Sequence, residues 1–564
     1  MSTVKINADQ IGSEQAVRED YALRQVPLTW RYSSSSLVVS LLGGATAGFF
    51  LALPGELAGS FGVWNVLIGM VVAVVIQTLI NYVFVNAAAR TGLSSDLMSR
   101  GLALGFDGSA WTTLVYWFTW VAYFATEGQI LGSAVTEQLG IPTWLSYLIV
   151  GIAFIPLVLY GIRFMVKFQR WTLYLYLIAM IALLIKVLMT PHVGSLISSQ
   201  ISNSKGMTIG GLGFLGVMAS YIGLIGNVTF GHADMGRLMA TERSLKRGAS
   251  KGALWISLIP YSIGAYFVAG ILGLLFWAVT NGNTNPGSYF VQLLGISGFI
   301  LIIITQLRIN LVNGYSGSLS LANFFSRLNF TPGRSFWAII MVVIGTMMMY
   351  GNVLGHLAQV LNFEGVFLSA WIGVIFTDYV FLRGKHKFGP HGGQFIEYRR
   401  AMLPHWNKVG VTALIVSTLV GAVLAFGSAL HAFGGPVLED LSSLITFIVA
   451  GVLTYILGLR DQGKSYSIRP LIAWPREDKV VECPIDHEVV STSDMFPCPF
   501  HKTWICSHDC MGTRNCGELC KNMTTEELLK IELPPLTDYL REANSHLATD
   551  SSPKDISHSP SMQV

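Results

Sequence analysis

Long apolar segments alternate with short polar connections over most of this chain. Segments of about 20 apolar residues, the length of a membrane-spanning helix, recur between residues 37 and 458. The polar stretches at either end divide the chain into an N-terminal segment (1–36), a transmembrane domain (37–459) and a soluble tail (460–564). We predict twelve spans, at about 37–60, 64–89, 110–136, 142–162, 169–190, 208–232, 252–279, 290–323, 335–352, 358–382, 409–431 and 437–458.

The composition supports this division. Of 564 residues, 52% are hydrophobic and only 12% are charged, and the mean hydropathy is +0.54. Soluble proteins carry about a quarter charged residues, so we predict an all-α polytopic membrane protein. The opening residues are polar and mixed in charge, which favours a cytoplasmic lead-in over a cleavable signal peptide.

Basic residues are concentrated in alternate connections. The connections after even-numbered spans are rich in Lys and Arg, whereas those after odd-numbered spans are nearly bare of them, apart from Lys205 after the fifth span. Because basic loops stay in the cytoplasm, we predict a multi-pass protein of the cell (inner) membrane with both termini cytoplasmic. The basic connections hold Arg90 and Arg100; Arg163, Lys167 and Arg170; Arg243–Lys251; Arg327 and Arg334; and Arg383, Lys385, Lys387, Arg399 and Arg400.

The eighth span carries polar residues where hydrocarbon is expected. Gln306, Arg308, Asn310 and Asn313 interrupt the apolar run 299–328. A charge at the bilayer centre costs from roughly 2.5 to more than 10 kcal/mol, so this face must contact protein, water or ligand. It is either a polar seam that holds the bundle together or a substrate and coupling site.

Two spans are rich in residues that permit a broken helix. The first contains Gly43, Gly44, Gly48, Pro54 and Gly55, and the sixth contains seven glycines between 210 and 231. Breaks five spans apart are typical of an inverted five-plus-five repeat, with ligand or ion bound at the free helix ends. The alternative is that these glycines only allow close helix packing.

Several segments together resemble one family. They are TGLSSDLMSRGLALGFDGSAWTTLVYW, IPTWLSYLIVGIAFIPLVLYGI, HADMGRLM, NGYSGSLSLANFFSRL and FIEYRRAMLPHWNKVG. They resemble, over about residues 20–470, the purine/cytosine permease branch of the nucleobase:cation symporter-1 family. The resemblance implies a leucine-transporter-type fold, with two five-helix inverted repeats plus two peripheral helices and a site between spans 1, 3, 6 and 8.

The same resemblance implies where a substrate binds. Family members hold a flat heterocycle between aromatic rings and fix its edge with amides. Trp120 matches a stacking tryptophan, but Phe124 stands where the family has a polar partner, and Ile225 stands where some relatives have a second tryptophan. Tyr221 or Phe230 would then supply the second ring. The residues expected to bind substrate are Trp120, Phe124, Tyr221, Asn227, Asn313 and Gly44.

Charged residues inside the membrane domain have expected roles. Glu127 lies seven residues after Trp120 in the third span, and Arg308 in the adjoining eighth span is its expected ion-pair partner, with Gln306 and Asn310 nearby. Asp234 and Arg237, at the cytoplasmic end of the sixth span, match a family Asp-x-x-Arg motif. We expect that pair to be a structural ion pair that contributes to an inner gate.

Arg308 also bears on ion coupling. In sodium-coupled relatives, hydroxyls of span 8 help to hold the ion, and counting back from Asn313 places Leu307 and Arg308 there. A guanidinium at that place would replace sodium, and Glu127 could couple transport to protons. The alternative is that Arg308 points to Glu127 alone and that Thr305 or Ser316 binds sodium.

The tail has a different character. It contains all six cysteines of the chain, with three histidines among them. Cytoplasmic thiols stay reduced, so we predict a metal-binding tail, with ligands enough for two tetrahedral zinc sites or, alternatively, a mixed His/Cys iron–sulfur cluster. The other reading is a redox-labile or disordered tail. The tail resembles cysteine-rich segments that follow permease-like domains in some bacterial sensor kinases. The expected ligands are Cys483, His487, Cys498, His501, Cys506, His508, Cys510, Cys516 and Cys520.

Two functions fit these patterns. The first is a permease for a nucleobase or related nitrogen heterocycle, working by alternating access without sodium. The second is a transporter-like sensor that signals through its metal-binding tail to a partner such as a histidine kinase. An enzyme and a nucleic-acid partner are not expected, because the membrane body contains no catalytic triad or phosphate-binding loop.

Overall fold

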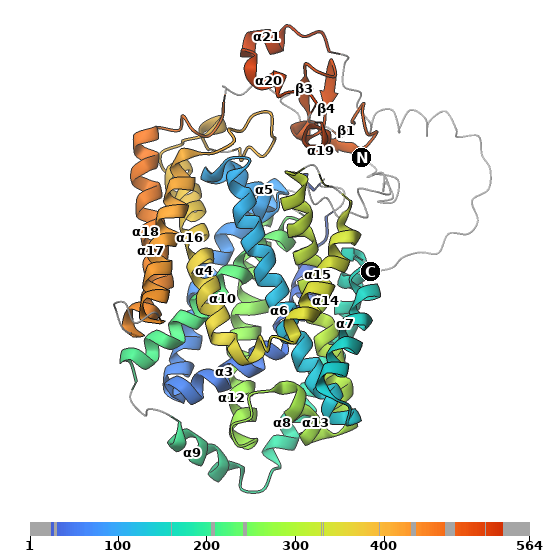
Figure 1. Cartoon of the computed structure of the whole chain (residues 1–564), viewed down its shortest axis with the longest axis vertical. Coiled ribbons are helices and arrows are strands. Elements are labelled where there is room, and N and C mark those ends of the chain that lie inside the picture. The colour runs from blue at the N-terminus through green and yellow to red at the C-terminus, as the bar shows by residue number, and fades with distance from the viewer. Residues whose placement is uncertain are drawn as a thin grey trace, which may run out of the picture.

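The computed structural model describes a bundle of long helices with a small β-containing domain at one end (Figure 1). Its described residues are 24–26, 31–159, 161–204, 209–240, 245–328, 330, 332–393, 395–429, 436–468, 480–513 and 515–533. Residues 545–564, whose polar composition predicts disorder, and most of the predicted N-terminal segment lie outside these residues.

Every predicted span falls on a helix or a run of helices. Within the described ranges, eight single helices are long and apolar enough to cross a membrane, and a bent pair makes nine. The predicted twelve are reached only by adding α6 and two shorter apolar helices, α7 and α15. The principal helices are α2 (Ser34–Ala45), α3 (Gly48–Phe61), α4 (Val63–Thr91), α6 (Gly108–Leu139), α7 (Thr143–Leu159), α8 (Gly161–Leu188), α10 (Gly211–Gly236), α14 (Ile296–Ser326), α15 (Arg334–Met349), α16 (Leu357–Thr377), α17 (Lys408–Ala429) and α18 (Pro436–Asp461).

The seventh span is continuous but irregular. It runs from α11 (Leu245–Ser257) through a π-helical segment η4 (Leu258–Ala269) into α12 (Gly270–Val279). The connecting segments are α5 (Ser95–Ser99), η3 (Arg100–Leu104), α9 (Val193–Asn203), α13 (Pro286–Leu294), η5 (Leu354–His356), η6 (Asp378–Arg383) and η7 (Pro390–Gly393).

The predicted break in the first span is present. Helices α2 and α3 are bent by 48° at residues 46 and 47. The Thr46 hydroxyl donates to the Gly43 carbonyl over 2.7 Å, which satisfies one of the carbonyl groups freed at the end of α2. Polar backbone groups at this depth are tolerated only where protein or a cavity surrounds them.

The predicted break in the sixth span is wrong, because α10 is one helix from Gly211 to Gly236. Its glycines serve close packing instead. A Cβ at Gly216 would collide with the Phe61 ring, and one at Gly223 would collide with the Leu361 carbonyl. Gly314 and Gly317 likewise lie inside the unbroken α14, so glycine content alone did not separate a packing face from a break.

The bundle brings together helices that are far apart in sequence. Helix α6 packs along α14, α10 packs along α4, and α16, α17 and α18 pack against one another. Figure 1 shows α6, α10 and α14 in the middle of the bundle, with α17 and α18 along one side. The start of α3 therefore lies close to α6, α10 and α14.

The tail folds into a small unit that covers one end of the bundle (Figure 1). Strands β1 (Val480–Glu482) and β2 (Val489–Ser491) form one antiparallel pair, and β3 (Phe496–Cys498) and β4 (Thr503–Ile505) form another. Thr524 and Glu527 form a capping box at the last described helix. The tail also contains η8 (Thr492–Asp494), α19 (Ser507–Gly512), α20 (Leu519–Asn522) and α21 (Thr525–Leu529).

The connection between η7 and α17 receives the tail. Arg399 donates to the Met495 carbonyl over 3.0 Å, and Arg400 pairs with Glu518 at 2.9 Å. His405 contacts the second oxygen of Glu518 at 2.8 Å. Although partial burial opposes ionisation, Lys521, Arg400 and His405 lower the pKa of Glu518 to about 2.

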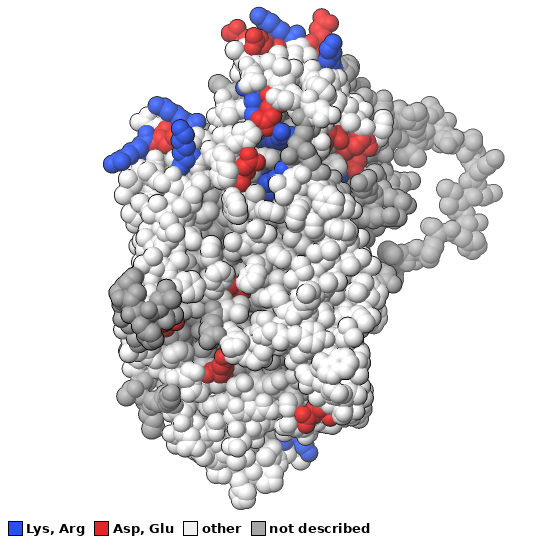
Figure 2. Space-filling view, viewed as in Figure 1, with Lys and Arg blue, Asp and Glu red and all other residues white. Residues whose placement is uncertain are grey.

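Charged side chains gather at the end that carries the tail. In Figure 2 the visible face is almost bare of Lys and Arg in its middle, whereas basic and acidic groups cluster over the tail and the adjacent helix ends. This distribution is the one expected for a membrane-embedded body with an exposed basic end.

Candidate functional site

A buried cavity lies beside the break between α2 and α3, and α6, α10, η4 and α14 complete its wall. Trp120 is only 4% exposed, and Asn227 and Asn313 are each 1% exposed, so the site is closed in this conformation. The lining residues are Leu41, Ala47, Phe49, Phe50, Trp120, Tyr123, Glu127, Leu224, Asn227, Val228, Gly231, His232, Tyr261, Ile309, Val312 and Asn313.

The Asn313 amide is oriented by its neighbour on α14. Asn310 donates to the Phe124 carbonyl over 3.4 Å, so its own oxygen faces Asn313 and accepts from that amide over 2.9 Å. The Asn313 side-chain oxygen has no partner among the described residues. A buried unpaired acceptor costs about 1–3 kcal/mol, and here it lies on the cavity wall, where a ligand N–H would satisfy it.

The Asn227 amide on α10 is likewise oriented by a neighbouring side chain. The Thr119 hydroxyl donates to the Tyr116 carbonyl over 2.8 Å, so toward Asn227 it acts as the acceptor. The Asn227 side-chain oxygen is then left without a described partner, on the cavity wall. Two residues on different helices that line the same cavity thus each carry an amide oxygen without a described partner.

Aromatic and imidazole groups complete the wall, and sequence reasoning missed most of them. His232 contacts Asn81 through Nδ1, and its Nε2 has no partner in the described part of the chain. Its ring lies 4.5 Å from that of Tyr261 in an edge-on arrangement. An ionisable residue inside a span is a functional candidate by itself, and that signal would have identified His232; Tyr261 gave none.

Three residues expected in the substrate site lie outside the cavity. Phe124 packs edge-on against Phe154 with ring centroids 5.3 Å apart, and it faces Gly345. The Tyr221 ring packs edge-on against the Tyr266 ring, with centroids 5.6 Å apart. Gly44 faces the Tyr261 hydroxyl. Phe230, the other candidate for a second ring, stacks on Trp371 with centroids 3.7 Å apart. Phe49, Phe50, Tyr123 and Tyr261 supply the other rings of the cavity instead.

Glu127, a residue of α6, contacts the start of α3. Its Oε1 accepts a hydrogen bond from the Phe49 amide over 3.1 Å, and the Gln306 side chain lies beside it. This amide belongs to the first turn of α3, where N–H groups lack helical partners and the helix dipole favours a carboxylate. Glu127 therefore stabilises the second half of the broken span while it also lines the cavity.

Arg308 contacts the other side of the break. Its Nε donates to the Thr46 hydroxyl over 3.2 Å, and its Nη1 donates to the Gln169 carbonyl over 2.8 Å and to the Thr172 hydroxyl over 2.5 Å. The expected ion pair with Glu127 is wrong: within the described residues, the two side chains bind different helix ends. The Thr305 hydroxyl donates to the Ile302 carbonyl over 2.9 Å, one turn back on its own helix.

Asp234 and Arg237, the expected gate pair, lie close enough for their charges to interact, and the Asp234 carboxylate also contacts other segments. The Asp234 carboxylate accepts from the Ser95 amide over 2.7 Å and from the Tyr116 hydroxyl over 3.2 Å. Arg237 reaches the backbone oxygen of Asp234 over 3.1 Å. Asp234 thus ties α10 to the connection between α4 and α6 rather than only to its own helix.

An ionic cluster at the end of the bundle that carries the tail was not predicted from the sequence. Asp96 pairs with Arg100 at 3.0 Å and with Arg327, at the end of α14, also at 3.0 Å. Arg100 also donates to the sulfur of Met511 in the tail over 3.2 Å. Asp96 and Arg100 follow each other at helical spacing, but nothing local in sequence indicates that Arg327 joins them.

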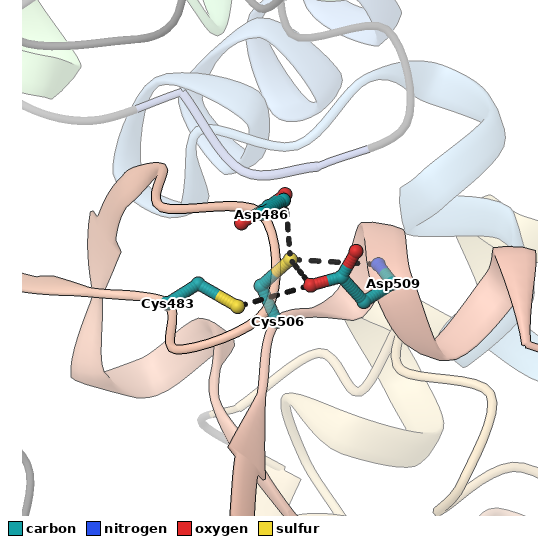
Figure 3. Close-up of side chains that lie close together, drawn as sticks. All are labelled: Cys483, Asp486, Cys506 and Asp509. Carbon is teal, nitrogen blue, oxygen red and sulfur yellow. Dashed lines mark hydrogen bonds between the residues drawn. The ribbon is translucent and has the colours of Figure 1, made fainter. Parts of the chain in front are cut away.

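The predicted metal ligands of the tail separate into groups. Cys483 and Cys506 meet Asp486 and Asp509, and the four side chains point toward one another in Figure 3. Cys498, Cys510, Cys516 and Cys520 line a different small pocket, in which burial raises the pKa of Cys510 to about 12.

The three histidines have different surroundings. His501 Nδ1 lies 3.3 Å from the Cys498 sulfur, and His508 Nδ1 lies 3.7 Å from Asp486. His487 is 76% exposed and contacts Glu482 at 2.9 Å, away from the cysteines. Spacing placed His487 among the ligands, but its backbone conformation turns it outward.

The site is therefore a closed cavity beside a broken span, inside a bundle of apolar helices. The family model described as "Permease for cytosine/purines, uracil, thiamine, allantoin" matches residues 50–458. The chain belongs to this permease family, the nucleobase:cation symporter-1 family, and is a transporter rather than an enzyme.

Relatives support this assignment. The chain is 23% identical over 419 residues to "Putative purine-cytosine permease YxlA" of Bacillus subtilis (strain 168), covering 69% of this chain and 84% of the relative. Mhp1, a nucleobase-cation-symport-1 transporter solved in a closed conformation with bromovinylhydantoin bound, has a TM-score of 0.61 at 18% identity, over 82% of this chain and 96% of its own.

A further solved structure shares the fold. A sodium-coupled sialic acid symporter has a TM-score of 0.56 at 12% identity, over 79% of this chain and 95% of its own. These similarities show a leucine-transporter-type fold. None of the comparisons supports the predicted sensor role, which stays a prediction.

Proposed function

We propose that the chain is a secondary transporter for a nucleobase or related nitrogen heterocycle, working by alternating access without sodium. The observation that carries this proposal is a pair of amide oxygens without described partners, on Asn227 and Asn313, two residues that line one closed cavity beside Trp120. A flat ring with N–H groups on its edge satisfies both amides and buries its faces against the surrounding aromatic rings.

The family and its relatives are consistent with that substrate class. The matching family description names nucleobases, thiamine and allantoin, and Mhp1 was solved with a hydantoin. All of these contain nitrogen heterocycles. The acceptor-rich site of this chain favours those members that carry ring N–H donors.

The break in the first span supports independence from sodium. The guanidinium of Arg308 donates to Thr46, the residue that caps α2. Arg308 therefore brings a permanent positive charge to the C-terminal end of α2, the negative end of the helix dipole. A second cation within a few Å would be repelled by several kcal/mol at an effective dielectric near 20.

The orientation follows from the basic connections. We propose that the end carrying the tail faces the cytoplasm of the cell membrane, because the basic connections of the sequence lie there. Both termini are then cytoplasmic, and the substrate would enter from the end near α9.

A ligand screen on the purified protein tests the proposal. Thermal shifts should be measured across nucleobases, hydantoins, allantoin and thiamine-like rings, each compared with an analogue methylated at a ring nitrogen. The expected result is stabilisation by a parent heterocycle and its loss on methylation, because a methyl group removes the N–H that the amides accept. Equal stabilisation by parent and methylated rings would contradict recognition through Asn227 and Asn313.

A matched pair of variants localises the binding. Asn313→Ala should abolish the shift, whereas Asn362→Ala, which alters an amide on α16 that does not line the cavity, should leave it unchanged. Uptake of the radiolabelled ligand into cells, with and without residues 475–564, then tests transport itself and whether the tail is needed for it.

A further inference from the structure

We propose that Cys483, Asp486, Cys506 and Asp509 form a four-coordinate site for a zinc-class divalent metal ion, which holds the tail in its folded form. One ligand atom from each side chain lies within 4.8 Å of all the others. The transporter family matches only residues 50–458, so this site belongs to an addition that the family core does not contain.

The four ligands come from two segments of the tail. Cys483 and Asp486 lie at the turn between β1 and β2, and Cys506 and Asp509 lie at the start of α19. Figure 3 shows the two sulfur atoms and the two carboxylates directed at one point. A metal ion there would join the first hairpin of the tail to its first helix.

The contacts among these groups favour a cation at their centre. The Cys483 sulfur lies 3.0 Å from Asp509, and the Cys506 sulfur lies 3.4 Å from Asp509 and 3.5 Å from Asp486. Cys483 and Cys506 are fully buried. Two carboxylates that share so small a space repel each other, and a bound divalent cation would turn this repulsion into coordination.

Within its described residues, the tail has only a small apolar core of its own. Its four strands have three residues each. The apolar cluster around the first hairpin contains only Val481, Val490 and Met495 besides the two cysteines, with Trp504 packed against it. Units of this size generally need a disulfide, a metal or a partner surface to fold.

The donor set selects the class of metal. Thiolates favour zinc and other borderline or soft ions over magnesium and calcium, which take oxygen ligands. Two sulfur and two oxygen donors also suit tetrahedral zinc. Arg24 pairs with Glu488 and lies 3.9 Å from Asp486, so a cationic group orients one of the carboxylates from outside.

Metal analysis of the full-length protein tests the site. The protein is purified in detergent without chelator, and zinc is measured by mass spectrometry in the wild type and in four variants. Cys483→Ser and Cys506→Ser should each lose about one equivalent of zinc per chain relative to the wild type. Asp486→Asn and Asp509→Asn should release zinc at a lower chelator concentration, by at least the roughly tenfold that even outer-sphere changes produce.

His487→Ala is the matched control. His487 is a candidate ligand by spacing but lies in solvent, so its replacement should leave the zinc content unchanged. Cobalt added to metal-stripped protein should give the visible absorption of a tetrahedral thiolate site, and Cys506→Ser should remove it. The heterocycle thermal shift of each variant reports whether the membrane domain is still folded.

Three results would overturn the proposal. The first is full zinc content in both the cysteine and the aspartate variants. The second is loss of zinc in His487→Ala, or loss of zinc in additional Cys516 or Cys520 variants while the Cys483 and Cys506 variants keep theirs. The third is a wild-type protein that contains no zinc and takes up none when zinc is added.

Discussion

Glu127 and Arg308 lie on opposite sides of the break in the first span, and each binds one of the two helix ends there. Glu127 accepts from the Phe49 amide at the start of α3, and Arg308 donates to Thr46 at the end of α2. A carboxylate at a helix N-terminus and a guanidinium at a helix C-terminus are both favourable. The two side chains therefore each contact one of the helix ends that the break creates.

Removing the carboxylate should destabilise the closed site. Glu127→Ala leaves the Phe49 amide without its acceptor, and a buried unpaired donor costs about 1–3 kcal/mol. Thermal unfolding in detergent should show a lower midpoint for Glu127→Ala than for Glu127→Gln, which keeps an acceptor oxygen. Equal midpoints for the two variants would show that the hydrogen bond to α3 is not important for stability.

The amides of the cavity should determine affinity. Asn313→Ala and Asn227→Ala should each weaken ligand binding by about 1–3 kcal/mol, because each removes a buried acceptor. Trp120→Ala should cost about 0.5–1.5 kcal/mol for the lost ring interaction and more for the lost apolar area. Isothermal titration measures these changes. Phe124→Leu, outside the cavity, serves as the control and should bind normally.

A methyl group on α10 should disturb the stacking ring. A Cβ at Gly231 would lie 3.0 Å from the Trp120 ring, whereas one at Gly59 meets no atom within 4 Å. Gly231→Ala should therefore weaken ligand binding, and Gly59→Ala should not. If Gly231→Ala binds as the wild type does, Trp120 does not hold the ligand in the position described.

Attachment of the tail should depend on pH through Glu518. The pKa of this carboxyl is about 2 in the folded protein, below its usual value near 4.3. A lowered pKa means that the charged form stabilises the folded state, so this contribution is present above about pH 4.3 and is lost as the pH falls toward 2. Glu518→Gln should therefore lower the unfolding midpoint of the tail at pH 7, and its difference from the wild type should shrink as the pH falls through that window.

A tail that detaches equally in the wild type and in Glu518→Gln at pH 7 would contradict this role. Hydrogen exchange at residues 515–523 gives the local measurement at pH 7. Lys530→Ala, which changes an exposed charge on the same tail, is the control.

The sequence predicted the helical body well because hydrophobic length and basic connections are local signals. It also placed Arg308 near the break, since family spacing positions span 8 against span 1. The predicted break in α10 was wrong, because the sequence does not distinguish a glycine that packs against Leu361 from a glycine that breaks a helix. Arg308 also donates to the hydroxyl of Thr172, which lies in another span, and no local sequence pattern indicates such a contact.

Residue spacing was also insufficient to predict which side chains of the tail come together. Cysteine and histidine spacing indicated a metal, but Asp486 and Asp509 converge with the cysteines only in three dimensions. Spacing cannot report that His487 turns outward at a positive φ of 57°. The metal site of the tail therefore stays a prediction, and the structure changes which side chains are its best candidate ligands.

The response of ligand binding to sodium tests the central claim, a heterocycle transporter in which Arg308 takes the place of a bound cation. The affinity for the strongest ligand of the heterocycle panel should be measured in sodium chloride and in choline chloride at equal ionic strength. The guanidinium at Thr46 predicts the same affinity in both salts. A tenfold tightening in sodium chloride, about 1.4 kcal/mol of coupling, would contradict it.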